Sequence, residues 1–420
     1  MGEKLALLGG PKAVTRDAGE ATRWPIITEE DEAAVLEVLR SGDMSGTGVT
    51  KVFEQEFGAY FGMPHCLAHC NGTAALLSAM FACGIGVGDE IICPSVTYWA
   101  SALPVYQLGG TVVFADCDLD TLNIDPADIE RHISNRTKAI VVVHYCGYPC
   151  EMDEIMVIAR RHGLKVIEDV SHAQGSLYQG RLTGTIGDVA AMSLMSGKSL
   201  VAGEAGMLVT RDRGIWERAV AFGHYERHGD LTDPDLVRYK GFAFGGVKHR
   251  LMQLASALGR VQLRHYTARI EAIQSAMNYF WDLLEGCPGV KAHRPPKGSG
   301  STMGGWYAAK GLYRAEELGG LDIDRFCEAV SAEGCSIGAG ANTAMHLHPL
   351  LNDADLYGHG KPTRIANSAR DLRQPPGSLP RSEKLGRAVF RIPHFKHLYK
   401  DVIEEHAAAI RKVAERADEL

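Results

Sequence analysis

The feature that most restricts the fold of this chain is the alternation of short apolar runs with longer amphipathic stretches between about residues 65 and 210. Short, nearly continuous apolar runs are typical of strands that are covered on both faces. The stretches between them, at 74–83, 126–133 and 152–161, have helical spacing. This order predicts an α/β fold with a mostly parallel sheet, which binds ligands at the carboxyl ends of its strands. The predicted strands are 90–93, 111–115, 138–143, 165–169, 189–193 and 207–210.

The segments on either side of this core carry helix signals of their own. A near capping box at Thr28–Asp31 starts a helix that runs to Leu39. After the core, residues 253–285 predict one or two long helices that lead to a second domain, and residues 402–420 predict a final helix. The length of 420 residues is enough for two domains of ordinary size.

The charge and hydropathy of the chain exclude several classes of partner. Its 44 Lys and Arg residues against 51 Asp and Glu residues give a net charge of −7, without a long run of like charges. We therefore expect no binding to nucleic acid or to a membrane, and a small-molecule ligand instead. The apolar stretches are too short to span a bilayer and the N-terminus lacks a secretory signal pattern, so we expect a cytoplasmic protein.

The run Asn71-Gly72-Thr73-Ala74 precedes one of the predicted helices. A turn of small residues at a helix N-terminus presents backbone N–H groups that can bind a phosphate. Such turns also occur as ordinary N-caps without any ligand. The run is therefore a candidate phosphate site whose assignment depends on the residues near it.

Two further elements follow this run in chain order. Asp169 closes a predicted strand shortly before His172, and a carboxylate there is either a helix N-cap or the partner of a protonated pyridine nitrogen. Lys198 lies in a loop rich in Gly and Ser. A lysine in such a loop is either solvated or, beside an acid and a phosphate site, the nucleophilic amine that a Schiff base requires. The order of the three elements carries more weight than any one of them.

In this order the residues resemble the DegT/DnrJ/StrS family, the fold-type-I pyridoxal-phosphate (PLP) aminotransferases that act on keto-sugars and keto-cyclitols. The resemblance extends from about Trp24 to the C-terminus and implies a homodimer. It also implies a large domain with a mostly parallel seven-stranded sheet and a smaller C-terminal α+β domain. The expected divisions are an N-terminal segment at 1–30, the large PLP-binding domain at 31–265 and the smaller domain at 266–420. The motifs that carry the resemblance are 71–75, 94–100, 116–125, 168–172 and the Lys198 loop.

The resemblance implies roles for particular residues. Lys198 would form the Schiff base with PLP and act as the general base, Asp169 would face the pyridine nitrogen, and His172 would reach the 3-oxygen of the ring. Tyr98, in preference to Trp99, would stack on the ring. The residues expected to hold the phosphate are Gly72, Thr73, Ala74 and Ser193.

One segment departs from the family pattern. Many members carry Gly-x-Asn-x-Arg, whose Asn reaches the cofactor phosphate of the neighbouring subunit, whereas this chain has Gly246, Lys248 and Arg250 at those positions. The resemblance implies that Lys248 makes this contact, with active sites at the subunit boundary. The alternative is a solvated lysine on a loop before a helix.

The expected activity is PLP-dependent transfer of an amino group from glutamine or glutamate to a keto-cyclitol or keto-sugar. Residues 5–13 and Trp24-Pro25 resemble members that act on cyclitols such as scyllo-inosose. A nucleotide-4-keto-sugar aminotransferase is the first alternative. A PLP-dependent sugar dehydratase is a second, but those we know replace the lysine by His, so Lys198 argues against it. A non-catalytic PLP-binding regulatory protein is a third, and it would retain the cofactor residues.

Two clusters that contain histidine are not assigned to a metal. His65 to Cys70 contains four potential zinc ligands, but the run predicts a strand, whose side chains alternate between faces and do not converge on one ion. His346 and His348 form only a short pair. We therefore expect no metal site.

Overall fold

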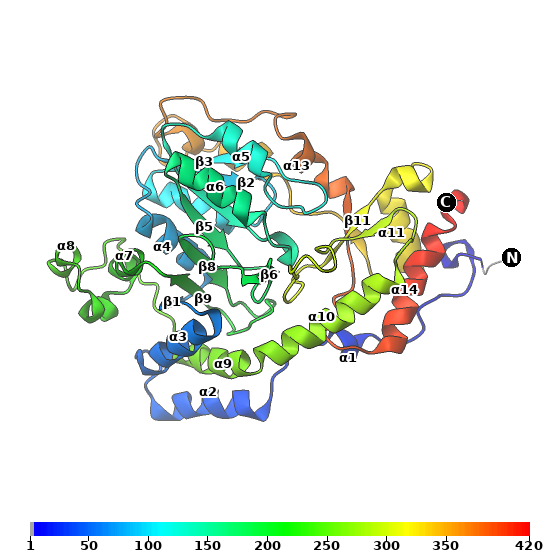
Figure 1. Cartoon of the computed structure of the whole chain (residues 1–420), viewed down its shortest axis with the longest axis horizontal. Helices are drawn as coiled ribbons and strands as arrows, with labels where there is room; N and C mark the ends of the chain where they lie inside the picture. Colours follow the sequence, from blue (N-terminus) through cyan, green and yellow to red (C-terminus); the bar gives the residue numbers. More distant parts are fainter. Residues whose placement is uncertain (1–3) are drawn as a thin grey trace.

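The predicted strands form the centre of a seven-stranded sheet in the computed structural model, which describes residues 4–420 (Figure 1). The strand order is β1-β9-β8-β5-β4-β2-β3. Only β9 runs antiparallel to its neighbours, so the prediction of a mostly parallel sheet in an α/β fold is confirmed. The strands are β1 (His65–His69), β2 (Glu90–Pro94), β3 (Thr111–Ala115), β4 (Thr137–Val143), β5 (Lys165–Asp169), β8 (Val189–Ser193) and β9 (Gly206–Thr210).

The central strands are mostly apolar because helices cover both faces of the sheet. Along β4, Ile140 and Val142 pack on one side while Ala139 and Val141 pack on the other. Strands buried on both faces have apolar residues at most positions. The first side is covered by α5 (Pro126–His132) and α6 (Met152–His162), and the second by α4 (Gly72–Ala82) and α7 (Arg213–Gly223).

The capping box predicted at Thr28 is present in the structure. The carboxylate of Asp31 accepts a hydrogen bond from the backbone N–H of Thr28 at 2.9 Å. Helix α2 (Glu29–Ser41) starts there and ends at Gly42, whose φ of 74° is in the left-handed region. Helix α3 (Gly48–Phe61) follows and leads into β1.

The long helical stretch at 253–285 consists of two helices. Helix α9 (Gln253–Arg264) and helix α10 (Tyr266–Leu283) meet at His265, and α10 extends from the large sheet to the second sheet (Figure 1). The final helix α14 (Lys400–Ala414) starts and ends earlier than predicted, and a single turn at Ala417–Glu419 follows it. Within residues 4–420, no helix has both the length and the hydropathy that a bilayer crossing requires.

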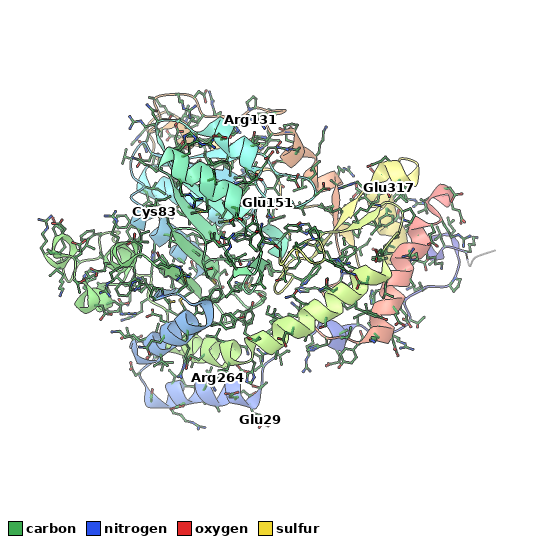
Figure 2. The ribbon with its side chains drawn as sticks, viewed as in Figure 1. Glu29, Cys83, Arg131, Glu151, Arg264 and Glu317 are labelled. Atoms are coloured by element: carbon green, nitrogen blue, oxygen red, sulfur yellow. The ribbon has the colours of Figure 1, made fainter. Side chains whose placement is uncertain are left out.

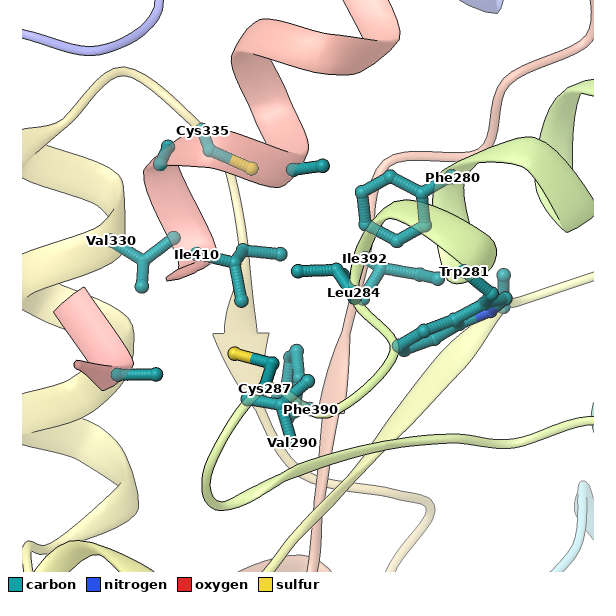
Figure 3. Packing of buried hydrophobic residues seen from close by; sticks show 14 of the residues in the cluster. Phe280, Trp281, Leu284, Cys287, Val290, Val330, Cys335, Phe390, Ile392 and Ile410 are labelled. Carbon is teal, nitrogen blue, oxygen red and sulfur yellow. The ribbon is translucent and has the colours of Figure 1, made fainter. Parts of the chain in front are cut away.

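The second sheet is small and antiparallel, with the order β10-β11-β13-β12. Figure 3 shows its apolar core, in which Phe280 and Trp281 of α10 lie near Phe390 and Ile410. Leu5 of the N-terminal segment is fully buried in the same core. The predicted small C-terminal α+β domain is therefore present. Its elements are β10 (Val290–Ala292), β11 (Lys310–Tyr313), α11 (Ile323–Ala332), β12 (Gly338–Ala339) and β13 (Val389–Arg391), with α1 (Gly19–Thr22) beside them.

The chain returns to the large sheet before it completes the small one. In the segment that contains α12 (Pro349–Asn352) and α13 (Pro380–Lys384), the Gln374 side chain bonds both backbone groups of Phe114 on the edge strand β3, at 3.0 and 2.7 Å. An uncovered edge strand can pair with the strand of another chain and so promote aggregation. The Gln374 amide covers the edge of the sheet at Phe114.

The start of α4 packs unusually close to the ends of β8 and β9. A Cβ atom on Gly206 would lie 2.3 Å from the backbone oxygen of Asn71, and one on Gly72 would lie 2.9 Å from the backbone nitrogen of Ser193. Both positions therefore require glycine, and the contact brings the N-terminus of α4 beside the end of β8.

We predict that Gly206→Ala lowers the free energy of unfolding by about 1–3 kcal/mol, because the added methyl group collides with backbone that cannot move aside. Denaturant titration monitored by circular dichroism measures the change. Gly386→Ala is the matched control, since Gly386 is exposed and a Cβ atom there meets nothing within 4 Å. Equal stabilities of the two variants would show that the contact is not tight.

Candidate active site

A cavity of about 490 Å³ opens at the carboxyl ends of the parallel strands. Val143, Asp169 and Ser193 line it at the ends of β4, β5 and β8. This is the edge at which α/β sheets bind ligands. Of the residues expected from the sequence, the structure brings Gly72, Thr73, Tyr98, Asp169, His172, Ser193 and Lys198 to its wall, and leaves Ala74 and Lys248 off it.

The N-terminus of α4 offers two backbone amides to this cavity. Asn71 caps the helix, and its side-chain oxygen accepts a hydrogen bond from the N–H of Ala74 at 2.8 Å. The N–H groups of Gly72 and Thr73 have no acceptor within residues 4–420. Unpaired amides at a helix N-terminus attract an anion, so these two, rather than that of Ala74, remain for a phosphate.

Lys198 is a buried amine on the wall of the cavity, with 7% of its surface exposed. Its Nζ lies 3.8 Å from the centroid of the Tyr307 ring, and no carboxylate among the described residues forms an ion pair with it. Burial lowers the pKa of Lys198 to about 8, although the charge of Asp169 acts in the opposite direction. A lysine of this kind supplies more neutral, nucleophilic amine near neutral pH than an ordinary exposed lysine does.

The loop that carries Lys198 is held by its backbone. The N–H of Lys198 donates to the oxygen of Met195 at 2.8 Å, and the indole Nε1 of Trp24 donates to the oxygen of Lys198, also at 2.8 Å. Trp24 lies far from Lys198 in the sequence, so the N-terminal segment helps to place the Lys198 loop.

Asp169 is oriented by two donors. Its Oδ2 accepts from the hydroxyl of Ser101 at 2.7 Å, and its Oδ1 accepts from the N–H of Ser171 at 3.0 Å. Hydrogen bonds to an ionised carboxylate are strong and directional, so Asp169 presents a fixed negative charge to the cavity.

His172 is neutral in the folded protein. Its Nδ1 accepts a hydrogen bond from the N–H of Cys146 at 3.2 Å, which leaves the ring proton on Nε2. Burial, together with the positive charges of Lys198 and Lys310, lowers the pKa of His172 well below its usual value. The side chain is therefore a hydrogen-bond donor rather than a cation.

Several residues of the cavity wall were not predicted from the sequence. Ser101 lies shortly after Tyr98, and Tyr307 and Asn342 come from the second half of the chain. Trp306 and Ala308 on either side of Tyr307 have φ angles of 54° and 53°, in the left-handed region that non-glycine residues rarely adopt. This conformation places the Tyr307 ring over Lys198, and no local sequence signal indicates it.

Of the two aromatic residues considered for stacking, one lines the cavity, and Lys248 lies outside it. Tyr98 lines it, whereas its neighbour Trp99 does not, and both rings are about half exposed. Lys248 is exposed outside the cavity of its own chain, with Nζ 6.0 Å from the centroid of the Tyr225 ring.

The histidine clusters have structural partners. The run His65–His69 forms β1, and His69 is fully buried with its Nδ1 2.9 Å from the oxygen of Leu67. His346 contacts Ser95 and Glu383. In the described part of the chain, no group of three or more His, Cys, Asp or Glu side chains is arranged to hold a metal ion.

The arrangement fits pyridoxal 5′-phosphate, the cofactor expected from the sequence. Two unpaired amides at a helix N-terminus suit its phosphate, and the buried amine of Lys198 suits its aldehyde carbon. The fixed carboxylate of Asp169 suits a protonated ring nitrogen, and neutral His172 suits an oxygen of the ring.

Comparisons with known proteins agree with this geometry. The model of the DegT/DnrJ/EryC1/StrS aminotransferase family matches residues 25–411. The L-glutamine:scyllo-inosose aminotransferase of Streptomyces griseus is 30% identical over 435 aligned residues, which cover 100% of both chains. GDP-perosamine synthase of Caulobacter vibrioides is 37% identical over 257 residues, which are 61% of this chain and 67% of that protein.

Relatives with higher identity match over a shorter part of their length. Three relatives that are 35–38% identical to this chain are covered over 62–67% of their own length. Among solved structures, the aminotransferase from Psychrobacter cryohalolentis is 28% identical, with a TM-score of 0.81 over 94% of this chain and 99% of that chain.

We predict that, in the cofactor-free protein, a small amine-acylating reagent labels Lys198 at a rate that rises with pH. The midpoint of this rise should give an apparent pKa of about 8. The amine is protonated and unreactive below this pH, and the labelling rate should level off above about pH 9 because deprotonation is then nearly complete. Peptide mass spectrometry measures the rate, with exposed Lys400 as the internal reference. A rate that rises in step with that of Lys400 up to pH 10 would contradict the prediction.

Proposed function

Because the chain belongs to the DegT/DnrJ/EryC1/StrS aminotransferase family, we propose that it transfers an amino group from glutamine or glutamate to a small uncharged keto-cyclitol or keto-sugar. The observation that carries this proposal is the buried amine of Lys198, with a pKa of about 8, on the wall of the cavity that also presents Asp169. A scyllo-inosose-like acceptor is favoured.

Bound PLP supplies a protonated pyridine ring that accepts the electron pair left behind when the substrate carbon loses its proton. Lys198 would act as the general base, because its Nζ would take this proton from the substrate carbon and hold it for return. A pKa of about 8 suits both directions of this transfer near neutral pH. Asp169, held by Ser101 and Ser171, would keep the proton on the ring nitrogen.

The remaining residues bind and orient. Gly72, Thr73 and Ser193 would hold the phosphate, and the Nε2–H of His172 would donate to the ring oxygen. Tyr307 covers the amine of Lys198, which excludes water from that side and keeps the lysine desolvated.

The charges on the cavity wall support an uncharged acceptor. Within the described residues, Lys198 is the only Lys or Arg on the wall, and Glu204 adds a negative charge. A diphosphate is normally bound by Arg or Lys side chains, and Glu204 would repel it. Arg227 is not on this wall, because it pairs with Glu54 at 2.8 Å and lines another cavity.

The segment 338–348 supports the same acceptor class. Asn342 lines the cavity and its side-chain oxygen accepts a hydrogen bond from the hydroxyl of Tyr145 at 2.6 Å. Short polar groups of this kind suit the hydroxyls of a polyol. The similarity over the full length to a scyllo-inosose aminotransferase also supports the proposal.

A nucleotide-4-keto-sugar aminotransferase is the second candidate. It is favoured by the 37% identity with GDP-perosamine synthase over 257 residues. In that case a second subunit would have to supply the cations that the wall of this chain lacks.

We predict that the protein, loaded with pyridoxamine phosphate, returns to the pyridoxal form faster with scyllo-inosose than with a nucleotide-4-keto-sugar. The reason is the absence of a second cation on the described wall. Stopped-flow absorbance at matched acceptor concentrations measures the two rates, with Lys198→Ala as the inactive control. A faster return with the nucleotide sugar would favour the second candidate, and no return with either would contradict both.

We further propose that the protein is a dimer in which Lys248 contacts the cofactor phosphate of the neighbouring subunit. The segment after α7, which contains α8 (Pro234–Val237) and continues to residue 246, projects from the sheet at the left of Figure 1. It exposes Tyr239, Phe242 and Phe244, and Phe242 is 82% exposed. Apolar side chains gathered on a projecting segment are typical of a subunit interface. Exposed Lys248 follows directly on this segment.

We predict that mixing Lys198→Ala chains with Lys248→Glu chains restores activity that neither variant has alone. In each heterodimer one site combines an intact Lys198 with an intact Lys248 from the other chain. Random pairing then yields about a quarter of the wild-type activity. Activity assays after subunit exchange measure the recovery. No recovery, with heterodimers shown by native mass spectrometry, would contradict the shared site.

A further inference from the structure

A second cavity, of about 260 Å³, lies among three segments that are distant in sequence. They are the stretch between α1 and α2, the junction of α9 and α10, and the loop between β13 and α14. In Figure 2, Arg264 at the end of α9 and Glu29 at the start of α2 mark this region. The polar or aromatic residues on its wall are Trp24, Thr28, His265, Arg269, Lys396 and His397, and the wall contains no Asp or Glu.

Lys396 is the most unusual group on this wall. It is 4% exposed, and its Nζ lies 3.0 Å from His394 Nε2 and 4.6 Å from the centroid of the Trp24 ring. No carboxylate among residues 4–420 forms an ion pair with it. Its backbone N–H donates to the oxygen of Ala21 at 2.7 Å, which fixes the loop. Burial lowers the pKa of Lys396 to about 7, because no carboxylate compensates a positive charge on this amine, and a bound anion would favour the charged form.

His394 does not supply that counterion. Its Nε2 also lies 2.8 Å from the oxygen of Gly305, and burial together with the charge of Lys396 lowers the pKa of His394 well below its usual value. The imidazole is therefore neutral and provides a polar contact without charge.

Arg269 adds a second cation on the same wall. Its guanidinium donates to the side chain of Gln262 and to the oxygen of Ile26, but to no carboxylate within the described residues. Neighbouring basic residues are paired, since Arg264 and His265 both contact Glu30. Lys396 and Arg269 are thus the two Lys or Arg side chains on the wall, and neither forms an ion pair with a carboxylate among the described residues.

We propose that this cavity binds a small dianion, either one phosphate group or a dicarboxylate, between Lys396 and Arg269. Lys396 is buried and Arg269 is half-buried, and neither donates a hydrogen bond to a carboxylate among the described residues. An anion bound between them would offset the free-energy cost of burying these charges, and the cavity provides the space. Guanidinium and ammonium groups are the usual ligands of phosphate and carboxylate. The site is distinct from the active-site cavity and does not depend on the identity of the acceptor.

The location joins this site to the active site. Trp24 lines the second cavity, and its indole nitrogen donates to the backbone oxygen of Lys198. A bound dianion would therefore lie one side chain away from the loop that carries the catalytic lysine.

The test uses the PLP-loaded protein, so that phosphate cannot enter the cofactor phosphate site. Inorganic phosphate and succinate are titrated separately at constant ionic strength, with Tm and isothermal calorimetry as readouts. We expect a saturable rise in Tm with one ligand per chain for at least one of the two anions. Saturation by phosphate alone identifies a phosphate site, and saturation by succinate alone identifies a dicarboxylate site.

Three variants separate a ligand site from a structural lysine. Lys396→Met should weaken binding about tenfold or more and raise the Tm of the anion-free protein, because it replaces an uncompensated charge with an apolar chain of similar size. Lys400→Met, at an exposed lysine nearby in sequence, should bind like the wild type. Arg269→Gln should weaken binding while it retains a donor for the neighbouring oxygens.

The opposite results would overturn the proposal. An equal rise in Tm for the wild type and for Lys396→Met would mean that the anion binds elsewhere. Failure of both anions to saturate the wild type, or a Lys396→Met protein that is less stable without loss of binding, would assign Lys396 a purely structural role.

Discussion

The contact between the start of α4 and the ends of β8 and β9 is the constraint on which the rest of the active site depends. At Gly206 and Gly72 any side chain would collide with backbone. Two backbone amides thereby lie beside the strand end from which the Lys198 loop starts. A phosphate, a nucleophilic amine and the carboxylate of Asp169 can then meet around one small molecule.

The side chains of Lys198 and Lys396 are both buried in this structure. The same physical cause lowers the pKa of Lys198 to about 8 and that of Lys396 to about 7. The surroundings differ, because Asp169 raises the pKa of Lys198 while no carboxylate acts on Lys396. We interpret Lys198 as a base that exchanges a proton, and Lys396 as an amine that becomes a cation when an anion binds beside it.

The N-terminal segment connects these two lysines. Trp24 donates a hydrogen bond to the backbone of Lys198 with its indole nitrogen, while its ring lies against the amine of Lys396. Leu5 of the same segment is buried in the core of the small domain. The first part of the chain therefore contacts both the core of the small domain and the Lys198 loop.

The sequence by itself determined what local physical chemistry encodes. Apolar runs indicated the strands and the capping box at Thr28 indicated α2, while the chain order of Asp169 and Lys198 and the family resemblance indicated the cofactor. Tertiary structure alone decided which groups meet. It paired Ser101 with Asp169, and it placed Tyr307 over Lys198 through left-handed backbone on either side of the tyrosine. Such contacts join residues distant in sequence and depend on how whole elements pack, so no periodicity or cap signal encodes them.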